Sequence, residues 1–508
     1  MSTTSGDPVV IAIDAGTTGV RSIAFDPDGS VLTSSYREFE QHFPRPGWVE
    51  HDATEIWDVT QTTLGEVAAA IDRPIAGIGI TDQRETVVAW DRRTGEVLHR
   101  AIVWQDRRTA GRCDELAAAG ELPRIRETTG LVLDPYFSGT KIEWLLREAR
   151  VAPRPGLAFG TIDSWLLWNL TGGTEGGVFA TDPSNASRTL LYDIRRLEWS
   201  EELCGLLGVP MDTLPEVRPS AGRFGTTAAG CAVGAGVPVS GIAGDQQSAL
   251  FGQACFEPGM TKNTYGTGSF VLMNVGATCP PPAEGLLTTV AWTVPGTLVG
   301  AGDGMVTHYA LEGAIFVTGA AVQWLRDGLE VIGAAPETEP LAASVEDTGG
   351  VVLVPAFTGL GSPWWDPYAR GTIVGLTRGT NRAHRARAAV EAMAFQTRDV
   401  VDAMCDAAGQ EVAELRVDGG AAAMDLLLQL QADQLRVPVI RPNATEITAQ
   451  GAAYLAGLAE GVWQDVGDVT SRRKVDAIFQ PLAEESAADA AHRQWTRAVE
   501  RARGWVES

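Results

Sequence analysis

The sequence predicts an α/β protein of two large domains. Its 508 residues exceed the roughly 100 to 250 residues that one hydrophobic core usually serves. Apolar, β-branched runs alternate with helical patterns along the chain, as they do in α/β domains. A strand, a Gly/Thr-rich turn and a second strand open the chain, and a similar unit recurs near its middle. We therefore expect domains at residues 1–254 and 255–508, with a cleft between them that grips a phosphate chain from both sides.

The first unit reads as an antiparallel meander. A β-branched run at 9–13 precedes the turn 14–19, and a second apolar run follows at 22–25. An Asp-Pro-Asp-Gly turn then leads to a third strand near Val31. In the rest of the first half, we expect strands at 75–81, 86–90 and 237–243 and helices at 139–148 and 246–254.

The second unit spans residues 262–269 and continues into an apolar run at 270–273. Further strands are expected at 351–355, 415–417 and 437–440, and helices at 382–408 and 421–435. No low-complexity segment or long linker separates these elements.

Composition excludes several classes of function. A formal net charge of -24 argues against a general binder of nucleic acid or of membrane surfaces, because such binding needs clustered Lys and Arg. No run approaches the roughly 20 apolar residues of a membrane-spanning helix. The six cysteines are dispersed without a Cys-x-x-Cys pair, and the six histidines have no metal-ligand spacing. We expect a cytoplasmic protein with small-molecule partners and neither nucleic-acid binding nor membrane insertion.

The first turn carries the groups that a magnesium-bound nucleotide needs. Asp14 places a carboxylate at a strand end, small residues offer backbone N–H groups, Thr17 and Thr18 add hydroxyls, and Arg21 adds a guanidinium. Taken alone, this turn is equally compatible with a plain hairpin. The second Gly/Thr turn, at 266–269, favours phosphate binding.

Two further sites follow predicted strands. Gly419 and Gly420 precede the expected helix at 421–435, where missing side chains let a nucleotide approach the backbone. Asp245 follows the strand at 237–243 and precedes a helix, so its carboxylate could accept a hydroxyl proton during phosphoryl transfer. A simple helix N-cap is the alternative role for Asp245.

Arg84 and Glu85 follow the strand at 75–81. They place a guanidinium group, which donates hydrogen bonds, next to a carboxylate, which accepts them. This combination suits adjacent hydroxyl groups on one ligand. A surface ion pair is the alternative interpretation.

Longer segments resemble the FGGY family of carbohydrate kinases over essentially the whole chain, and within it the members that phosphorylate glycerol. The segments are PGWVEHD at 46–52, GITDQRET at 79–86, DPYFSGTK at 134–141, SNASRT at 184–189, GIAGDQQSALFGQ from 241, NTYGTGSF from 263, YALEGAIF from 309 and PAFTGLGSPWWDPYARG from 355. The resemblance implies two actin-like, ribonuclease-H-like ATPase domains flanking an active-site cleft. It also implies ATP-dependent phosphorylation of glycerol to sn-glycerol 3-phosphate, with Mg²⁺.

The resemblance further implies a role for individual residues. The polyol would be held by Arg84, Glu85, Tyr136, Asp245, Gln246 and Phe270, with Asp245 as the general base. ATP would be contacted by Thr17, Thr18, Arg21, Thr267, Gly319, Gln323, Gly420 and Met424. Asp14 would hold Mg²⁺ through water, together with Asp245. Met424 departs from the family pattern, which commonly has Asn at this position.

Two other functions stay open. The first is kinase activity on another polyol or sugar, such as erythritol or a pentulose. The second is a non-catalytic nucleotide-binding relative, which would have little reason to keep Asp245 together with Arg84 and Glu85. The combination of Arg84, Glu85, Tyr136 and Phe270 favours glycerol. Assembly into a homodimer or homotetramer is also left open.

Overall fold

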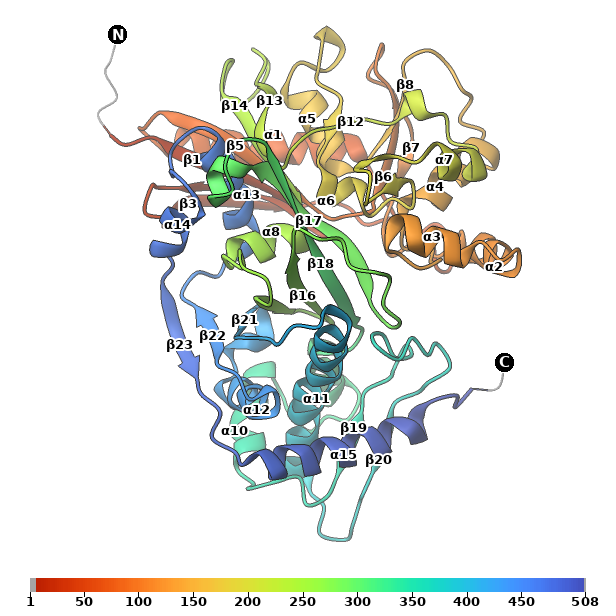
Figure 1. The fold of residues 1–508 in the computed structure, drawn as a ribbon, viewed down its shortest axis with the longest axis vertical. Helices are drawn as coiled ribbons and strands as arrows, with labels where there is room; N and C mark the ends of the chain where they lie inside the picture. Colours follow the sequence, from red (N-terminus) through yellow and green to blue (C-terminus); the bar gives the residue numbers. More distant parts are fainter. Residues whose placement is uncertain (1–5, 507–508) are drawn as a thin grey trace.

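The structure is a computed structural model that describes residues 6–506, and two β-sheets organise it (Figure 1). The first sheet has six strands, in the order β13 (Ala221–Thr226), β14 (Pro238–Gly244), β5 (Ile75–Asp82), β1 (Val9–Ala15), β2 (Gly19–Phe25) and β3 (Val31–Glu38). The second has seven, in the order β17 (Leu287–Pro295), β18 (Met305–Ile315), β16 (Ser269–Gly276), β15 (Thr261–Tyr265), β21 (Leu415–Asp418), β22 (Val439–Pro442) and β23 (Val475–Phe479).

The two sheets repeat one topology. In the first, β3, β2 and β1 are antiparallel neighbours, and β5 and β14 continue the sheet parallel to β1. In the second, β18, β16 and β15 are antiparallel neighbours, and β21 and β22 continue parallel to β15. The duplicated fold predicted from the two Gly/Thr turns is confirmed.

Strand register brings three acidic residues to one edge of the first sheet. Asp14 pairs with Thr81 and Ala15 with Asp82 in the parallel β1 and β5 pair. Gly244, the last residue of β14, pairs with Asp82. The carboxyl ends of parallel strands therefore coincide, and Asp245 begins the next helix at that same edge.

Helix α13 (Ile447–Ala459) belongs to the second half of the sequence but packs on the first sheet. It lies against β1, β5, β14 and the helix α8 (Asp245–Gly252), and Figure 1 draws it in blue among the red strands. Glycines allow this contact, because a Cβ atom added to Gly451 would lie 1.8 Å from the carbonyl oxygen of Ser248. The chain thus returns to the first sheet after most strands of the second sheet have been formed. A single domain boundary near residue 254 does not describe this return.

The predicted elements agree with the observed ones to within about three residues, with one correction. Helix α11 runs over Arg382–Ala408 as expected, and its N-cap Asn381 forms a capping box with His384. The helix expected at 421–435 instead begins at Asp425, after a 3₁₀ turn at Gly420–Ala423. Gly419 has a positive φ of 88° and Met424 has extended backbone, so the helix cannot start directly after the glycine pair.

The remaining elements complete the two halves. In the first half these are β4 (Glu50–His51), α1 (Ala53–Ala69), β6 (Val87–Asp91), β7 (Val97–Ile102), α2 (Ala110–Ala118), α3 (Leu122–Thr129), α4 (Ser138–Arg147), β8 (Leu157–Gly160), α5 (Ile162–Leu170), β9 (Ala180–Thr181), α6 (Pro183–Ala186), β10 (Tyr192–Asp193), β11 (Glu198–Trp199), α7 (Glu201–Leu207) and β12 (Glu216–Val217). In the second they are α9 (Gly319–Asp327), α10 (Thr338–Ala343), β19 (Val352–Val354), β20 (Thr372–Val374), α14 (Val466–Ser471) and α15 (Glu485–Ala502). Across residues 6–506, no helix is long and apolar enough to cross a membrane.

Candidate active site

Asp14 and Asp245 mark the centre of the candidate site. Asp14 lies near the carboxyl end of β1, and burial raises its pKa to about 7, with a further increase from the charge of Asp245. Arg21 opposes this shift. Asp245 begins α8 and accepts a hydrogen bond from the backbone N–H of Gln246 at 2.7 Å. Asp245 is therefore close enough to influence the ionisation of Asp14, and the two carboxylates can attract a cation together.

Arg84 connects Asp245 to a buried network of charges. Its Nε lies 3.1 Å from Oδ1 of Asp245, and its Nη2 donates to the hydroxyl of Tyr136 at 3.3 Å. Its Nη1 donates to Oε2 of Glu312 at 2.6 Å. Arg84 is 2% exposed, so the sequence alternative of a surface ion pair is wrong.

Arg188 and Glu312 complete the network. Arg188 donates to Glu85 at 2.7 Å and to Glu312 at 2.9 Å. Burial acts to raise the pKa of Glu312, but Arg188 and Arg84 outweigh it and lower the pKa to about 2. Burial raises the pKa of Glu85, against the effect of the same two arginines. Two guanidinium groups and two carboxylates thus alternate in the protein interior.

Lys141 fixes the backbone that carries Glu85. Glu85 has a positive backbone φ of 64°, which residues other than glycine rarely adopt. The Nζ of Lys141 donates to the carbonyl oxygen of Glu85 at 3.0 Å and to that of Tyr136 at 2.7 Å. Burial lowers the pKa of Lys141 to about 7. One buried ammonium group therefore holds together the two loops that present Glu85 and Tyr136.

Gln246 and Phe270 meet the second sheet. The Nζ of Lys262, on β15, donates to Oε1 of Gln246 and to the hydroxyl of Thr264. Phe270 pairs with Thr264 across β15 and β16 and is half-buried. Arg84, Glu85, Tyr136 and Asp245 thus share one network, whereas Gln246 lies beside Asp245 on α8 and Phe270 lies on β16 of the second sheet.

The first Gly/Thr turn holds the predicted phosphate contacts of the first sheet. Thr17 accepts a hydrogen bond from Nε1 of Trp104 at 3.0 Å, while Thr18 is exposed. Arg21 forms an ion pair with Glu446 and stacks on the ring of Tyr36, with 5.1 Å between the guanidinium carbon and the ring centroid. The guanidinium of Arg21 already has a carboxylate partner in this structure.

The second Gly/Thr turn meets the N-terminus of α9. The backbone N–H of Gly319 donates to the carbonyl oxygen of Gly266 at 3.0 Å, and that of Ala320 donates to Thr267 at the same distance. A Cβ atom on Gly319 would lie 2.6 Å from the oxygen of Gly266. This close approach explains the glycine and places Thr267 beside Gly319.

The other predicted nucleotide residues adjoin that turn. A Cβ atom on Gly419 would lie 2.4 Å from the carbonyl oxygen of Tyr265, so Gly419 lies directly against the strand that enters the turn. Gln323 and Gly420 are exposed. Met424 packs against the hydrophobic cluster that also contacts Trp324.

The acidic pair fits a magnesium ion that travels with a nucleotide. Among residues 6–506, no group of three or more His, Cys, Asp or Glu side chains could hold a metal by itself. Asp14 and Asp245 offer two carboxylates, and Mg²⁺ in such enzymes is typically held by one or two carboxylates, water and substrate phosphates. The donor set therefore matches this mode of binding.

Four residues of the network were not among the predicted site residues: Lys141, Arg188, Lys262 and Glu312. The segments DPYFSGTK, SNASRT and YALEGAIF contain three of them, so the sequence carried a signal for those positions. What it did not indicate was their pairing, since Arg84 and Glu312 are 228 positions apart.

Asp82, a third acid at this sheet edge, was also missed. It is buried, and it accepts hydrogen bonds from Nδ2 of Asn185 at 3.1 Å and from the backbone N–H of Asp163 at 3.3 Å. Burial, followed by the charge of Asp163, raises its pKa well above the ordinary value. Asp82 therefore adds a third carboxyl group to this sheet edge, and its burial favours the protonated form of that group.

Comparison with known proteins agrees with this architecture. Residues 9–252 match the N-terminal domain of the FGGY family of carbohydrate kinases, and residues 261–460 match its C-terminal domain. The chain belongs to the FGGY family of carbohydrate kinases.

Individual relatives extend over nearly the whole chain. A glycerol kinase of Carboxydothermus hydrogenoformans is 54% identical over 503 residues, covering 98% of each chain. A glycerol kinase of Dechloromonas aromatica is 55% identical over 512 residues, covering 99% of each. The crystal structure of Plasmodium falciparum glycerol kinase with ADP superposes with a TM-score of 0.91 at 35% identity and covers 99% of each chain. A xylulose kinase of Rhodospirillum rubrum gives a TM-score of 0.84 at 25% identity, covering 96% of this chain and 98% of that one.

Proposed function

We propose that this protein is a glycerol kinase that converts ATP and glycerol to ADP and sn-glycerol 3-phosphate. The observation that carries the proposal is the link from Asp245 through Arg84 to Tyr136, 3.1 Å and 3.3 Å long, in a chain 54% identical to a named glycerol kinase. The link places a carboxylate, a guanidinium and a phenol hydroxyl around one small volume at the sheet edge. These groups suit the hydroxyls of a short polyol.

The polyol would bind between the two sheets. Arg84 donates to substrate hydroxyls and Glu85 accepts from them, while Phe270 covers the carbon chain and Gln246 adds an amide contact. The ion pairs of Arg84 and Glu85 fix both side chains before substrate arrives, which reduces the entropy lost on binding. Lys141 contributes by positioning the loops of Glu85 and Tyr136.

Asp245 is the proposed general base. Its carboxylate accepts the proton of the reacting hydroxyl as the oxygen attacks the terminal phosphorus of ATP, and the bond from that phosphorus to ADP breaks. Arg84 orients the carboxylate from 3.1 Å away. Phosphoryl transfer depends mainly on positioning and on charge stabilisation, so a correctly placed carboxylate suffices as a base.

The nucleotide phosphates would lie between the two Gly/Thr turns. Thr17, Thr18 and Arg21 face them from the first sheet, and Thr267, Gly319, Gln323, Gly420 and Met424 form the nucleotide side on the second. Arg21 must then exchange Glu446 for a phosphate oxygen. Asp14 and Asp245 would hold Mg²⁺, which when bound supplies positive charge to the phosphate oxygens.

The test combines a substrate panel with one substitution. A coupled assay of ADP release should give glycerol the highest kcat/KM among glycerol, dihydroxyacetone, erythritol, xylulose and no acceptor. Asp245→Asn should lower turnover by ~100-fold or more, because the amide cannot accept the proton. Glycerol binding should change much less. Asp303→Asn, at an exposed position, is the matched control.

Three outcomes would contradict the proposal. A preference for xylulose or erythritol would move the assignment to another acceptor of the same family. ADP release that does not depend on any acceptor would indicate an ATPase. Near wild-type turnover of folded Asp245→Asn would show that another group accepts the proton.

A further inference from the structure

Lys262 is a fully buried lysine whose contacts the proposed function leaves without a role. It lies on β15, the strand that enters the second Gly/Thr turn, and it is 0% exposed. Within residues 6–506, no carboxylate oxygen lies within 4.0 Å of its Nζ. Burying an ammonium group without a close counter-charge costs free energy, and an apolar side chain of similar length would avoid that cost. Stability alone therefore does not account for a lysine at this position.

The two hydrogen bonds of Lys262 join residues on both sides of the candidate site. Its Nζ donates to Oε1 of Gln246, at the start of α8, and to the hydroxyl of Thr264 on β15 at 2.9 Å. Thr264 in turn pairs with Phe270 across β15 and β16. Gln246 and Phe270 are two of the residues that the proposed function assigns to the polyol. Lys262 therefore acts directly on one of them and lies beside the strand pair that carries the other.

The ammonium group decides which end of the Gln246 amide is left for a ligand. An ammonium group has three N–H donors and no acceptor, so only the carbonyl oxygen of the amide can face it. The NH₂ group, on the other branch of the amide, then remains for other partners. Among the described residues Nε2 of Gln246 has no hydrogen-bond partner, and this half-buried side chain does not enclose it in protein. Gln246 therefore offers the site a hydrogen-bond donor.

We propose that Lys262 is a positioning residue that fixes the Gln246 amide so that its NH₂ group donates to an oxygen of the acceptor substrate. The inference rests on the proposed function, because it uses the same polyol site. It narrows the class of acceptor to molecules that present an oxygen able to accept this hydrogen bond, in addition to the hydroxyl that loses its proton to Asp245. Lys262 itself does not touch the substrate, since it is fully buried.

A double-mutant cycle between Lys262 and Gln246 in the full-length protein tests the proposal. Lys262→Met should raise KM for glycerol by ~10-fold, as expected for the loss of one hydrogen bond to the substrate, while kcat and KM for ATP change much less. Gln246→Ala should raise KM for glycerol to a similar extent. The double variant should be no worse than Gln246→Ala alone, because Lys262 acts through the Gln246 amide.

Gln246→Glu tests which end of the amide faces the substrate. The carboxylate keeps an acceptor for Lys262 but has no N–H group, so KM for glycerol should rise about as much as in Gln246→Ala. Lys262→Met should melt no lower than wild type, because the substitution removes a buried charge that has no close partner. A raised KM in a protein of undiminished stability separates a positioning role from a structural one.

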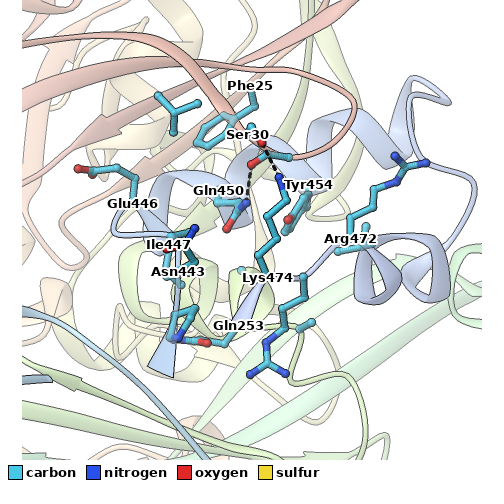
Figure 2. A pocket seen from close by; sticks show the side chains of 18 of the residues that line it. Phe25, Ser30, Gln253, Asn443, Glu446, Ile447, Gln450, Tyr454, Arg472 and Lys474 are labelled. Carbon is cyan, nitrogen blue, oxygen red and sulfur yellow. Dashed lines mark hydrogen bonds between the residues drawn. The ribbon is translucent and has the colours of Figure 1, made fainter. Parts of the chain in front are cut away.

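Lys474→Met is the matched control, because it removes a lysine from an exposed position. Figure 2 shows Lys474 at the wall of a cavity of about 230 Å³, where its Nζ donates to the hydroxyl of Ser30 at 2.9 Å. Neither Lys262 nor Gln246 lines that cavity. Both Michaelis constants of Lys474→Met should equal those of wild type.

Three outcomes would overturn the inference: a wild-type KM for glycerol in Lys262→Met or in Gln246→Glu, effects of Lys262→Met and Gln246→Ala that multiply in the double variant, or a melting temperature of Lys262→Met well below that of wild type. The wild-type protein in the same assay reports separately on the proposed function. If wild type phosphorylates glycerol and the cycle gives one of these outcomes, only the role of Lys262 is lost. If wild type does not phosphorylate glycerol, both are wrong.

Discussion

Replacing Glu312 with Gln removes the carboxylate that two buried arginines share. Glu312 is fully buried on β18, and Arg84 and Arg188 both donate to it. The amide keeps the shape of the side chain, but one of its two terminal groups becomes an N–H donor that faces guanidinium donors. The substitution therefore leaves two buried cations with one fewer counter-charge and creates a donor–donor contact.

The expected cost follows from this geometry. Removing one partner of a buried ion pair costs about 3 to 5 kcal/mol, because the remaining charge stays buried without compensation. A loss of 1 kcal/mol lowers the melting temperature of a domain of 150 to 250 residues by roughly 2 to 4 °C, so Glu312→Gln should melt about 6 to 20 °C below wild type. Arg84 also orients Asp245, so KM for glycerol should rise and turnover should fall.

Thermal denaturation and steady-state kinetics measure these effects together. Glu284→Gln, at an exposed position without an ion pair among the described residues, is the matched control and should behave like wild type. A melting temperature for Glu312→Gln equal to that of the control, with unchanged KM for glycerol, would refute the reasoning. It would show that the buried network neither stabilises the fold nor orients Asp245.

Two further predictions concern Met424, on the second sheet's side of the site, and Asp14, on the first sheet. Met424 packs on an apolar cluster, so Met424→Asn should change the Michaelis constant for ATP and leave that for glycerol unaltered; two unchanged constants would remove residue 424 from the nucleotide site. Burial holds the pKa of Asp14 at about 7, above its ordinary value of 3.8, so its contribution to stability is present at low pH and is lost as the pH rises through 7. In the absence of nucleotide and metal, the melting temperature of Asp14→Asn should therefore rise relative to that of wild type as the pH increases from about 5.5 to about 8.5. A difference in melting temperature between the two proteins that does not vary with pH would contradict the raised pKa of Asp14.

The sequence by itself determined the elements with strong local signals. The β-branched run at 9–13 and the Gly/Thr turns predicted the two repeated units, because alternation of strand and turn residues is a short-range property. Helix α11 was predicted from end to end, since Asn381 caps its start and apolar residues recur along it. Asp245 could be placed at a strand end for the same reason, although its catalytic role remains a prediction.

Only the tertiary structure decided which distant residues meet. Arg21 and Glu446 are 425 positions apart, and their pairing depends on α13 returning to the first sheet. The four charges of Arg84, Glu85, Arg188 and Glu312 assemble from three separate segments, because the register of β18 and the loops of the first half bring them into one buried volume. A short pattern records which residues are present and how they are spaced. Burial and long-range contact decide whether a charged side chain is solvated at the surface or held in a network inside, and these depend on how the two sheets pack together.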